Sequence, residues 1–128
     1  MNDWMAWIDV GEEVYVLPLR HENIIVEPDG HFYKAALYTP DGEFLKSIAT
    51  GAPGKSAMLE AQFWVRSNRK ADLDLVDPNA SWRTQPATAE QRAHLKRAHI
   101  AHSPELTAGE GATLITRHII GSQRRVRT

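Results

Sequence analysis

The sequence predicts an α+β protein: an antiparallel β-meander of three to four strands with one packed helix, followed by a C-terminal helical hairpin. Three observations lead to this prediction. The triplet Pro-Asp-Gly occurs at residues 28–30 and again at 40–42, beside stretches rich in β-branched and aromatic residues. One apolar helical stretch follows at residues 55–69. Two helix-start signatures then occur in the last third of the chain, at residues 88–91 and 107–110.

Turn residues divide the first half of the chain into short strands. Residues 3–8 predict a single helical turn or an irregular lead-in, with Trp4, Trp7 and Ile8 buried. In each Pro-Asp-Gly triplet proline presets φ, aspartate bonds its own backbone and glycine accepts a positive φ, so each triplet predicts a tight turn. Strands separated by such turns form an antiparallel meander. The predicted strands span residues 13–19, 23–27, 31–39 and 43–50.

The helix predicted at residues 55–69 carries apolar side chains over more than half of its surface. We therefore expect it to be largely buried across one face of the sheet. The aspartates and prolines that follow are typical of a loop, while Leu73, Val76 and Trp82 among them favour a loop that packs along the domain. The predicted organisation is residues 1–70, meander plus helix; 71–86, packed linker; 87–120, helical hairpin; and 121–128, basic tail.

The two helix-start signatures are capping boxes. In each, a threonine hydroxyl can accept a bond from the backbone N–H three residues on, and the Gln or Glu at that position can reach back to the threonine N–H. Thr88 with Gln91 and Thr107 with Glu110 have this spacing. They predict two short helices, at about residues 88–99 and 108–120, joined by a tight connection. Helices this short cannot bury their apolar faces alone, so we expect them to pack on each other.

Composition excludes several classes of protein. The 128-residue chain has 42% hydrophobic residues, which allows a modest core, and no cysteine, which excludes disulfides and thiolate metal sites. No apolar run approaches the roughly 18 residues that would cross a membrane. The first residues lack a basic region followed by an apolar stretch, so they do not resemble a secretory signal. From these features we expect a soluble, cytoplasmic protein.

The charge is unevenly distributed although the formal net charge is only −1. Residues 1–81 hold 13 acidic and 7 basic side chains, whereas residues 82–128 hold 3 acidic and 8 basic ones. Such a split is typical of a protein that contacts a polyanion with one part. Mutual attraction between the two parts of the chain explains it equally well, and charge alone does not decide between these readings.

Cap and core positions of the hairpin, within residues 87–115, form a recognisable pattern. Its residues are Ala87, Thr88, Gln91, Leu95, Ile100, Pro104, Leu106, Thr107, Glu110, Leu114 and Ile115. The pattern resembles a small helical module found near the C-termini of some bacterial and phage DEAD/DEAH-type helicases and in other phage DNA-processing proteins. This chain has His99 where the module has glycine, and Gly111 where it has alanine. The helicase motor is absent, so the resemblance implies a DNA-associated context without ATP-driven unwinding.

A set of basic side chains on the hairpin and the tail suits phosphate contact through charge-assisted bonds and counterion release. Arg92, Lys96 and His99 have near-helical spacing, and Trp82 and His94 could stack on exposed bases. A solvated polar face followed by a disordered tail is the alternative. The candidate nucleic-acid-binding residues are Arg92, Lys96, Arg97, His99, Arg117, Arg124, Arg125 and Arg127.

Two patterns suggest other chemistry more weakly. Residues 49–56 fit a loosened phosphate-loop pattern that includes Lys55, but the preceding strand follows a tight turn and Pro53 removes a donor. His94, His99 and His102 have spacings of five and three, which do not place a ligand pair on one helix face. We therefore predict no catalytic residues, no metal ligands and no cofactor.

Three functions follow, in order of preference. The first is a small non-enzymatic accessory protein of phage or bacterial DNA metabolism that binds nucleic acid, mainly its phosphates, through the basic hairpin. The second is a phage-type interaction module or inhibitor that binds a larger protein, such as a host nuclease or defence complex, through an acidic face. The third is a minimal nucleotide-binding enzyme that uses Lys55. The acidic face consists of Glu12, Glu13, Glu22, Glu27 and Asp29.

Overall fold

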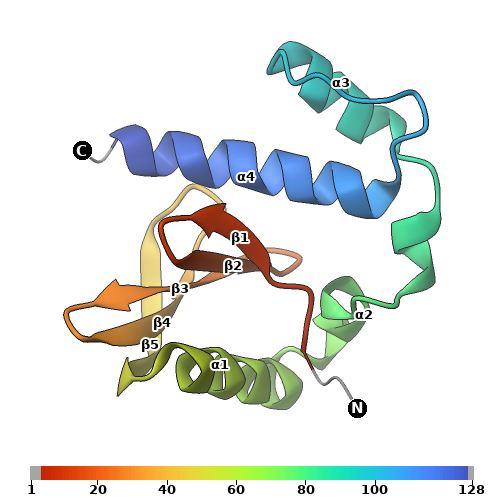
Figure 1. Cartoon of the computed structure of the whole chain (residues 1–128). Helices are drawn as coiled ribbons and strands as arrows, with labels where there is room; N and C mark the ends of the chain where they lie inside the picture. Colours follow the sequence, from red (N-terminus) through yellow and green to blue (C-terminus); the bar gives the residue numbers. More distant parts are fainter. Residues whose placement is uncertain (1–3, 127–128) are drawn as a thin grey trace. The chain divides into compact units, whose positions relative to one another are not determined.

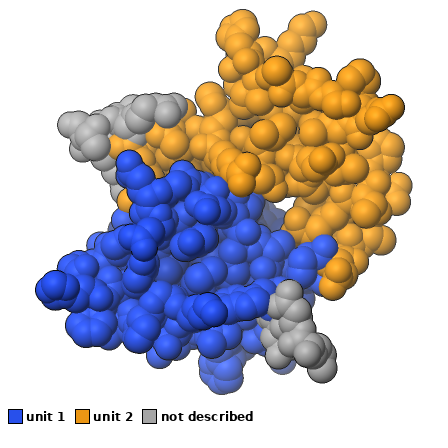
Figure 2. Space-filling model, in the orientation of Figure 1, with its two compact units in different colours: residues 1–78 blue, residues 79–128 orange. Residues whose placement is uncertain are grey.

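A computed structural model describes residues 4–126, without the side chains of Arg125 and Val126 (Figure 1). The chain forms two compact units, unit 1 at residues 1–78 and unit 2 at residues 79–128 (Figure 2). Unit 1 contains β1 (Ile8–Gly11), β2 (Val14–Pro18), β3 (Asn23–Asp29), β4 (Phe32–Tyr38), β5 (Phe44–Ala52), α1 (Gly54–Asn68), the short 3-10 turn η1 (Lys70–Asp72) and α2 (Leu73–Val76). Unit 2 contains the 3-10 turn η2 (Ser81–Thr84), α3 (Ala89–Arg97) and α4 (Ala108–Val126).

The sheet of unit 1 is an antiparallel meander in the order β1-β2-β3-β4-β5, which confirms the α+β class (Figure 1). The prediction of three to four strands was one strand short. Strand β1 begins at Ile8, the last residue of the predicted lead-in, and continues through residues 9–11, for which no element was predicted. Its residues pair with β2 in the register Ile8 with Val16 and Asp9 with Tyr15. The turn between these strands runs through Glu12 and Glu13, whose φ angles of 55° and 63° are left-handed. Turns of this kind normally use asparagine and glycine, so a pair of glutamates does not predict a hairpin here.

Helix α1 packs against β3, β4 and β5, as expected for a helix across one sheet face. Its buried positions are Ala57, Ala61, Gln62 and Val65, so a narrow stripe of mostly small residues faces the sheet. The expectation of a largely buried helix was wrong, because Leu59 is 49% exposed and Phe63 is 71% exposed. Small residues on the inner stripe let the helix backbone approach the sheet, and the larger side chains lie outside it.

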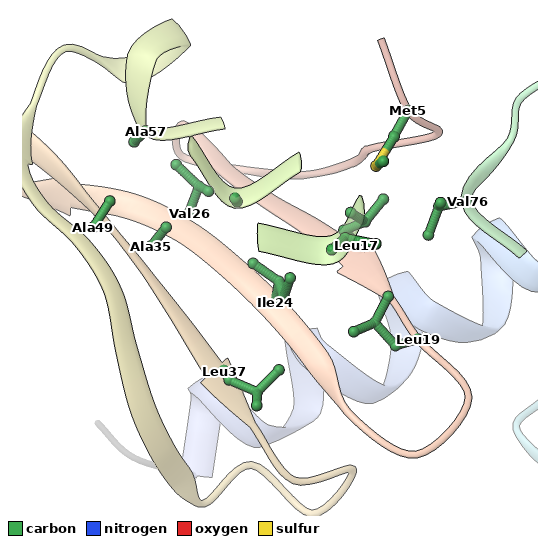
Figure 3. Packing of buried hydrophobic residues seen from close by; sticks show 12 residues of the cluster. Met5, Leu17, Leu19, Ile24, Val26, Ala35, Leu37, Ala49, Ala57 and Val76 are labelled. Carbon is green, nitrogen blue, oxygen red and sulfur yellow. The ribbon is translucent and has the colours of Figure 1, made fainter. Parts of the chain in front are cut away.

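The core of unit 1 lies between α1 and the sheet (Figure 3). One polar side chain, that of Gln62, is buried beside this core. Its Oε1 accepts hydrogen bonds from the Met5 N–H at 2.8 Å and the Trp7 Nε1–H at 2.9 Å. These two bonds attach the segment before β1 to α1 and satisfy a buried amide oxygen. The buried hydrophobic cluster contains Met5, Leu17, Leu19, Ile24, Val26, Ala35, Leu37, Ala49, Ala57, Ala61, Val65 and Val76.

The segment after α1 belongs partly to unit 1. The Val76 side chain joins the core, and its carbonyl accepts a hydrogen bond from the Ala6 N–H at 2.8 Å. Arg69 forms a two-bond ion pair with Glu22, with Nε–Oε1 and NH2–Oε2 distances of 2.8 Å. This pair joins the end of α1 to the turn before β3 and lowers the pKa of Glu22, mainly through the hydrogen bonds from Arg69.

The two helices predicted for the C-terminal third are present as α3 and α4, and they pack on each other. Both capping boxes form. The Gln91 N–H donates to the Thr88 hydroxyl at 3.1 Å, and the Glu110 N–H donates to the Thr107 hydroxyl at 3.2 Å. Helix α4 continues to Val126, so residues 121–126, predicted as the start of a basic tail, are helical.

Candidate nucleic-acid interface

The starts of α3 and α4 are joined by a short antiparallel bridge. The Ala87 N–H donates to the Leu106 carbonyl at 2.9 Å, and the Ala108 N–H donates to the Gln85 carbonyl at 2.8 Å. The Gln91 side chain adds a further link, because its Nε2 donates to the Ala108 carbonyl at 3.0 Å. Below the bridge, Ile100, Leu114 and Ile115 pack against a small core of Ala87, Leu95 and Leu106. These hydrogen bonds and apolar contacts fix the position of the basic helix α3 relative to the start of α4.

Helix α3 ends in a Schellman motif, the pair of bonds that commonly closes a helix before a left-handed residue. The Ile100 N–H donates to the Leu95 carbonyl at 2.9 Å, and the His99 N–H donates to the Lys96 carbonyl at 3.1 Å. His99 is the left-handed residue, with a φ of 58°. Glycine usually occupies this position, which is the position where the helicase-type module has glycine. The turn expected there forms with histidine.

Arg92 holds the connection between α3 and α4 in place. One of its terminal nitrogens donates to the Pro104 carbonyl at 2.7 Å, and the other donates to the Ser103 carbonyl at 3.4 Å. The Nδ1 of His102 lies 2.9 Å from the Ile100 carbonyl in the same connection. Arg92 was predicted as a phosphate contact. The structure gives its guanidinium a structural role as well, since two of its donors hold loop carbonyls.

These residues form an open groove of about 540 Å³ along α3, which we call the α3 groove. Among the predicted site residues, Arg92, Lys96 and His99 come together in it, and His102 joins them. Leu95, Ile100 and Ala101 form its apolar part. No carboxylate is among the described residues that line it. The sequence analysis missed His102 as a member of this set because the loop after α3 folds back, a path that helical spacing does not reveal.

The remaining predicted contacts lie elsewhere in unit 2. Arg97 is exposed on α3 outside the groove lining, and Arg117 and Arg124 lie on α4. The Arg125 side chain and all of Arg127 lie outside the described part of the chain.

The two rings proposed to stack on bases have partners within the protein. His94 packs edge-to-face against His118, with ring centroids 6.1 Å apart, at the α3–α4 contact. The Arg83 guanidinium lies over the Trp82 ring at 4.5 Å. Both rings therefore have structural contacts within unit 2.

The acidic face proposed as an alternative interface is largely used inside unit 1. Glu22 pairs with Arg69, the Glu13 carboxylate accepts a hydrogen bond from the Tyr33 hydroxyl at 2.8 Å, and Glu27 accepts one from the Tyr38 hydroxyl at 3.4 Å. A carboxylate that already holds an internal partner offers less charge to a basic protein groove.

The segment with the loosened phosphate-loop pattern joins β5 to α1. Every pairing in the sheet is antiparallel, whereas a phosphate loop follows a strand of a parallel sheet. Across residues 4–126, no helix combines the length and apolar character needed to cross a bilayer.

Comparison with known families gives one match. The family described as "Mitochondrial helicase Irc3, C-terminal domain" matches residues 4–128 of this chain. No curated protein and no solved structure matches it. The helicase C-terminal resemblance seen in residues 87–115 is thus confirmed and extends through unit 1, where the sequence analysis recognised nothing. A phage origin and a cytoplasmic location receive no support from the match.

Proposed function

The chain belongs to the family of C-terminal domains of the mitochondrial helicase Irc3, and from that premise we propose that it binds nucleic acid through the α3 groove. The family places the chain in a DNA and helicase context. The observation that carries the proposal is the groove itself, which gathers Arg92, Lys96 and His99 with no carboxylate among its described lining residues. An open cationic surface of this kind suits the phosphates of a strand.

The charges beside the groove are available to a ligand. Within residues 4–126, neither Lys96 nor Arg97 forms an ion pair. Both lie on the exposed side of α3. Two of the three acidic residues of unit 2 lie at helix starts, where Glu110 accepts bonds from Thr107 and Glu90 stands in the first turn of α3. A carboxylate at a helix start is stabilised locally by the helix dipole.

The backbone at His99 supports the same conclusion. A left-handed conformation costs a non-glycine residue about 1 kcal/mol or more. Strained backbone positions of this kind cluster at functional sites. The exposed imidazole of His99 lines the groove, where it can donate to a phosphate oxygen.

We propose a binding role and no catalysis. Shifted pKa values often mark catalytic groups. Those resolved among the described residues each follow from a structural hydrogen bond: Glu22 with Arg69, Tyr33 with Glu13, and Glu110 with Thr107. None of these groups lines the α3 groove.

The test is charge reversal with a matched control. The double variant Lys96→Glu and Arg97→Glu reverses one charge in the groove and the neighbouring exposed charge beside it. Affinity for a DNA fork and for single-stranded DNA should fall at least tenfold in fluorescence anisotropy, because two phosphate contacts are lost. The double variant Lys46→Glu and Lys70→Glu changes the net charge equally at exposed sites of unit 1 and should bind like the parent chain. Equal loss in both variants would show that only overall charge matters, and would reject the α3 groove as the site.

Salt dependence provides a second measurement. Two to three phosphate contacts predict a slope of about −2 to −3 for log affinity against log salt on duplex DNA. Removing Lys96 alone should reduce that slope by about one. A parent chain whose affinity does not change between about 50 and 200 mM salt would contradict phosphate-directed binding.

A further inference from the structure

Unit 1 contains a pocket of about 300 Å³ beside the start of α1, far in the sequence from the α3 groove. Three aromatic residues line it: Trp4 before β1, Tyr15 from β2 and Tyr33 from β4. Met58 adds apolar surface, and Lys55 is the one charged side chain among the described lining residues. We call this the aromatic pocket. Its volume is at the small end of the range for ligand sites, about 300–1,000 Å³.

Two contacts restrict the Tyr33 side chain that lines the pocket. The phenol donates a hydrogen bond to Glu13 Oε1 at 2.8 Å, and this bond raises the pKa of Tyr33, which keeps the hydroxyl protonated as the donor. The ring lies against Gly54 so closely that a Cβ there would stand 3.2 Å from the ring Cε1. A ring held in this way is pre-organised, so little side-chain entropy is lost when a ligand stacks on it.

One of these two contacts comes from Glu13, which lies in the strained β1–β2 turn. Glu12 and Glu13 both have positive φ, in a turn where glycine or asparagine would be relaxed. The Glu13 side chain reaches from that turn to Tyr33 on β4. Strained backbone positions cluster at binding sites, and here the strained residue also bonds a side chain of the pocket wall.

The chemistry of the lining selects one kind of occupant. Flat aromatic walls with almost no hydrogen-bonding groups favour a flat ring, and they tolerate different bases because every base has a π-face. Lys55 is exposed at the first turn of α1 and supplies a positive charge at the pocket, suited to an anionic group attached to that ring. A base with its phosphate combines these features, whereas an apolar peptide side chain would leave the lysine unused.

We propose that the aromatic pocket takes one unpaired nucleobase of a nucleic-acid strand, with Lys55 on the adjoining phosphate. This site goes beyond the α3 groove, because it recognises a base and not only the backbone. It also gives a role to the residues of the loosened phosphate-loop pattern, Gly54 and Lys55, without requiring a phosphate loop. Unpaired bases would then be preferred over fully paired duplex.

The decisive probe is a pair of short oligonucleotides of equal length, oligothymidylate and its abasic counterpart. Both carry the same phosphates, so the α3 groove binds them equally. The base-bearing strand should bind the chain about 5- to 100-fold more tightly, which is the usual effect of stacking one base. It should also quench tryptophan fluorescence, since Trp4 lines the pocket. Equal affinity for the two oligonucleotides overturns the pocket and leaves the α3 groove untouched.

Substitutions in the aromatic pocket test whether the preference for the base-bearing strand arises there. Tyr33→Leu should remove most of the preference for the base-bearing strand and leave abasic binding unchanged. Phe63→Leu removes an aromatic ring that is 71% exposed and lies outside the pocket, and should change neither. If Tyr33→Leu does not fold, Lys55→Gln provides the test at an exposed position, with a severalfold loss for oligothymidylate. A loss with Phe63→Leu equal to that with the pocket variants overturns the assignment.

Two further measurements distinguish binding of a strand from binding of a free nucleotide, and the aromatic pocket from the α3 groove. Free thymidine monophosphate should quench tryptophan fluorescence only at much higher concentration than the oligonucleotide. Equal potency of the free nucleotide overturns the strand as the occupant. If the double variant Lys96→Glu and Arg97→Glu keeps full affinity for both oligonucleotides, the α3 groove fails, while the aromatic pocket is still judged by the difference between the two strands.

Discussion

The backbone at His99 turns the chain out of α3 with a φ of 58°, a conformation that disfavours side chains with a Cβ. Two hydrogen bonds of the helix end fix this turn, so the residue cannot relax by rotating out of it. The imidazole is displayed at the rim of the α3 groove as a result. Stability favours glycine at this one position, whereas the proposed contact with a phosphate requires the imidazole.

Replacing His99 with glycine should separate those demands. His99→Gly is expected to raise the free energy of unfolding by about 1 kcal/mol, because glycine adopts the left-handed region without penalty. The same variant should bind single-stranded DNA several times more weakly. Urea unfolding followed by circular dichroism measures the first effect and anisotropy the second.

Two companion variants check the interpretation. His99→Asn keeps tolerance of the left-handed region and removes the imidazole, so it should be no less stable than the parent and should bind as weakly as the glycine variant. His99→Ala should not gain stability. A glycine variant with unchanged stability would mean that the turn is not strained.

At the scale of the elements, one amide side chain adds a hydrogen bond between α3 and the start of α4, beside the backbone bridge and the small apolar core. The Gln91 Oε1 accepts from the Thr88 N–H at 2.9 Å while its Nε2 donates to the Ala108 carbonyl at 3.0 Å. Gly111 lies against this amide, and a Cβ there would be 3.1 Å from Oε1. This contact explains why the chain has glycine where the helicase-type module has alanine.

Gly111→Ala should therefore destabilise unit 2 even though alanine is the better helix former. Gln91 is bonded at both ends of its amide and cannot give way without losing a bond. With Gln91→Ala already in place, the added Gly111→Ala should instead stabilise the protein by up to about 1 kcal/mol, the usual helix propensity difference. A double-mutant cycle by urea unfolding measures the change of sign. Additive effects would contradict a direct contact.

Local chemistry explains which elements were predictable. The extent of α1 and both capping boxes depend on residues a few positions apart, and the observed α1, Gly54–Asn68, is close to the predicted 55–69. Strand β1 was missed because its turn carries glutamates, so its pairing depends on β2 and not on the turn sequence. Gly121 resembles a stop signal, yet α4 passes through it.

The candidate sites divide in the same way. The helical spacing of Arg92, Lys96 and His99 predicted that these side chains lie along one flank of a helix, and all three line the α3 groove. The loop after α3 determines two other features, which spacing does not reveal. It brings the Pro104 carbonyl to the Arg92 guanidinium, and it returns His102 to the groove. The aromatic pocket joins residues from four separate segments, and no spacing rule relates Trp4 to Tyr33.

On the scale of the whole molecule, opposite charges are divided between the two units. Residues 1–78 contain 13 acidic and 7 basic side chains, and residues 79–128 contain 3 and 8. The near-zero net charge of the chain, −1, therefore conceals the basic surface that a polyanion would meet. Each unit also has one glutamate whose pKa is lowered, Glu22 by Arg69 and Glu110 by the Thr107 N–H and hydroxyl.

These two glutamates make the molecule sensitive to acid. Both pKa values are lower in the folded state, so their contribution to stability is complete at neutral pH and is lost as the pH falls through the lowered values. The melting temperature should drop between neutral pH and about pH 3, and Glu22→Gln should flatten part of that drop. Lys46→Gln serves as the control, because Lys46 is exposed and forms no ion pair within residues 4–126. An identical pH profile for the parent and Glu22→Gln would reject the assignment.

Strand β5 is the last in the order of the sheet, and it spans nine residues, Phe44–Ala52, with Phe44 and Leu45 exposed. A long outer strand with exposed apolar side chains invites another chain to add itself there. Register shifts along the β4–β5 pairing and the charge of Lys46 oppose that addition. Changing Lys46 to valine would remove one of these two safeguards, so the variant should self-associate through pairing of β5 with the same strand of a second copy.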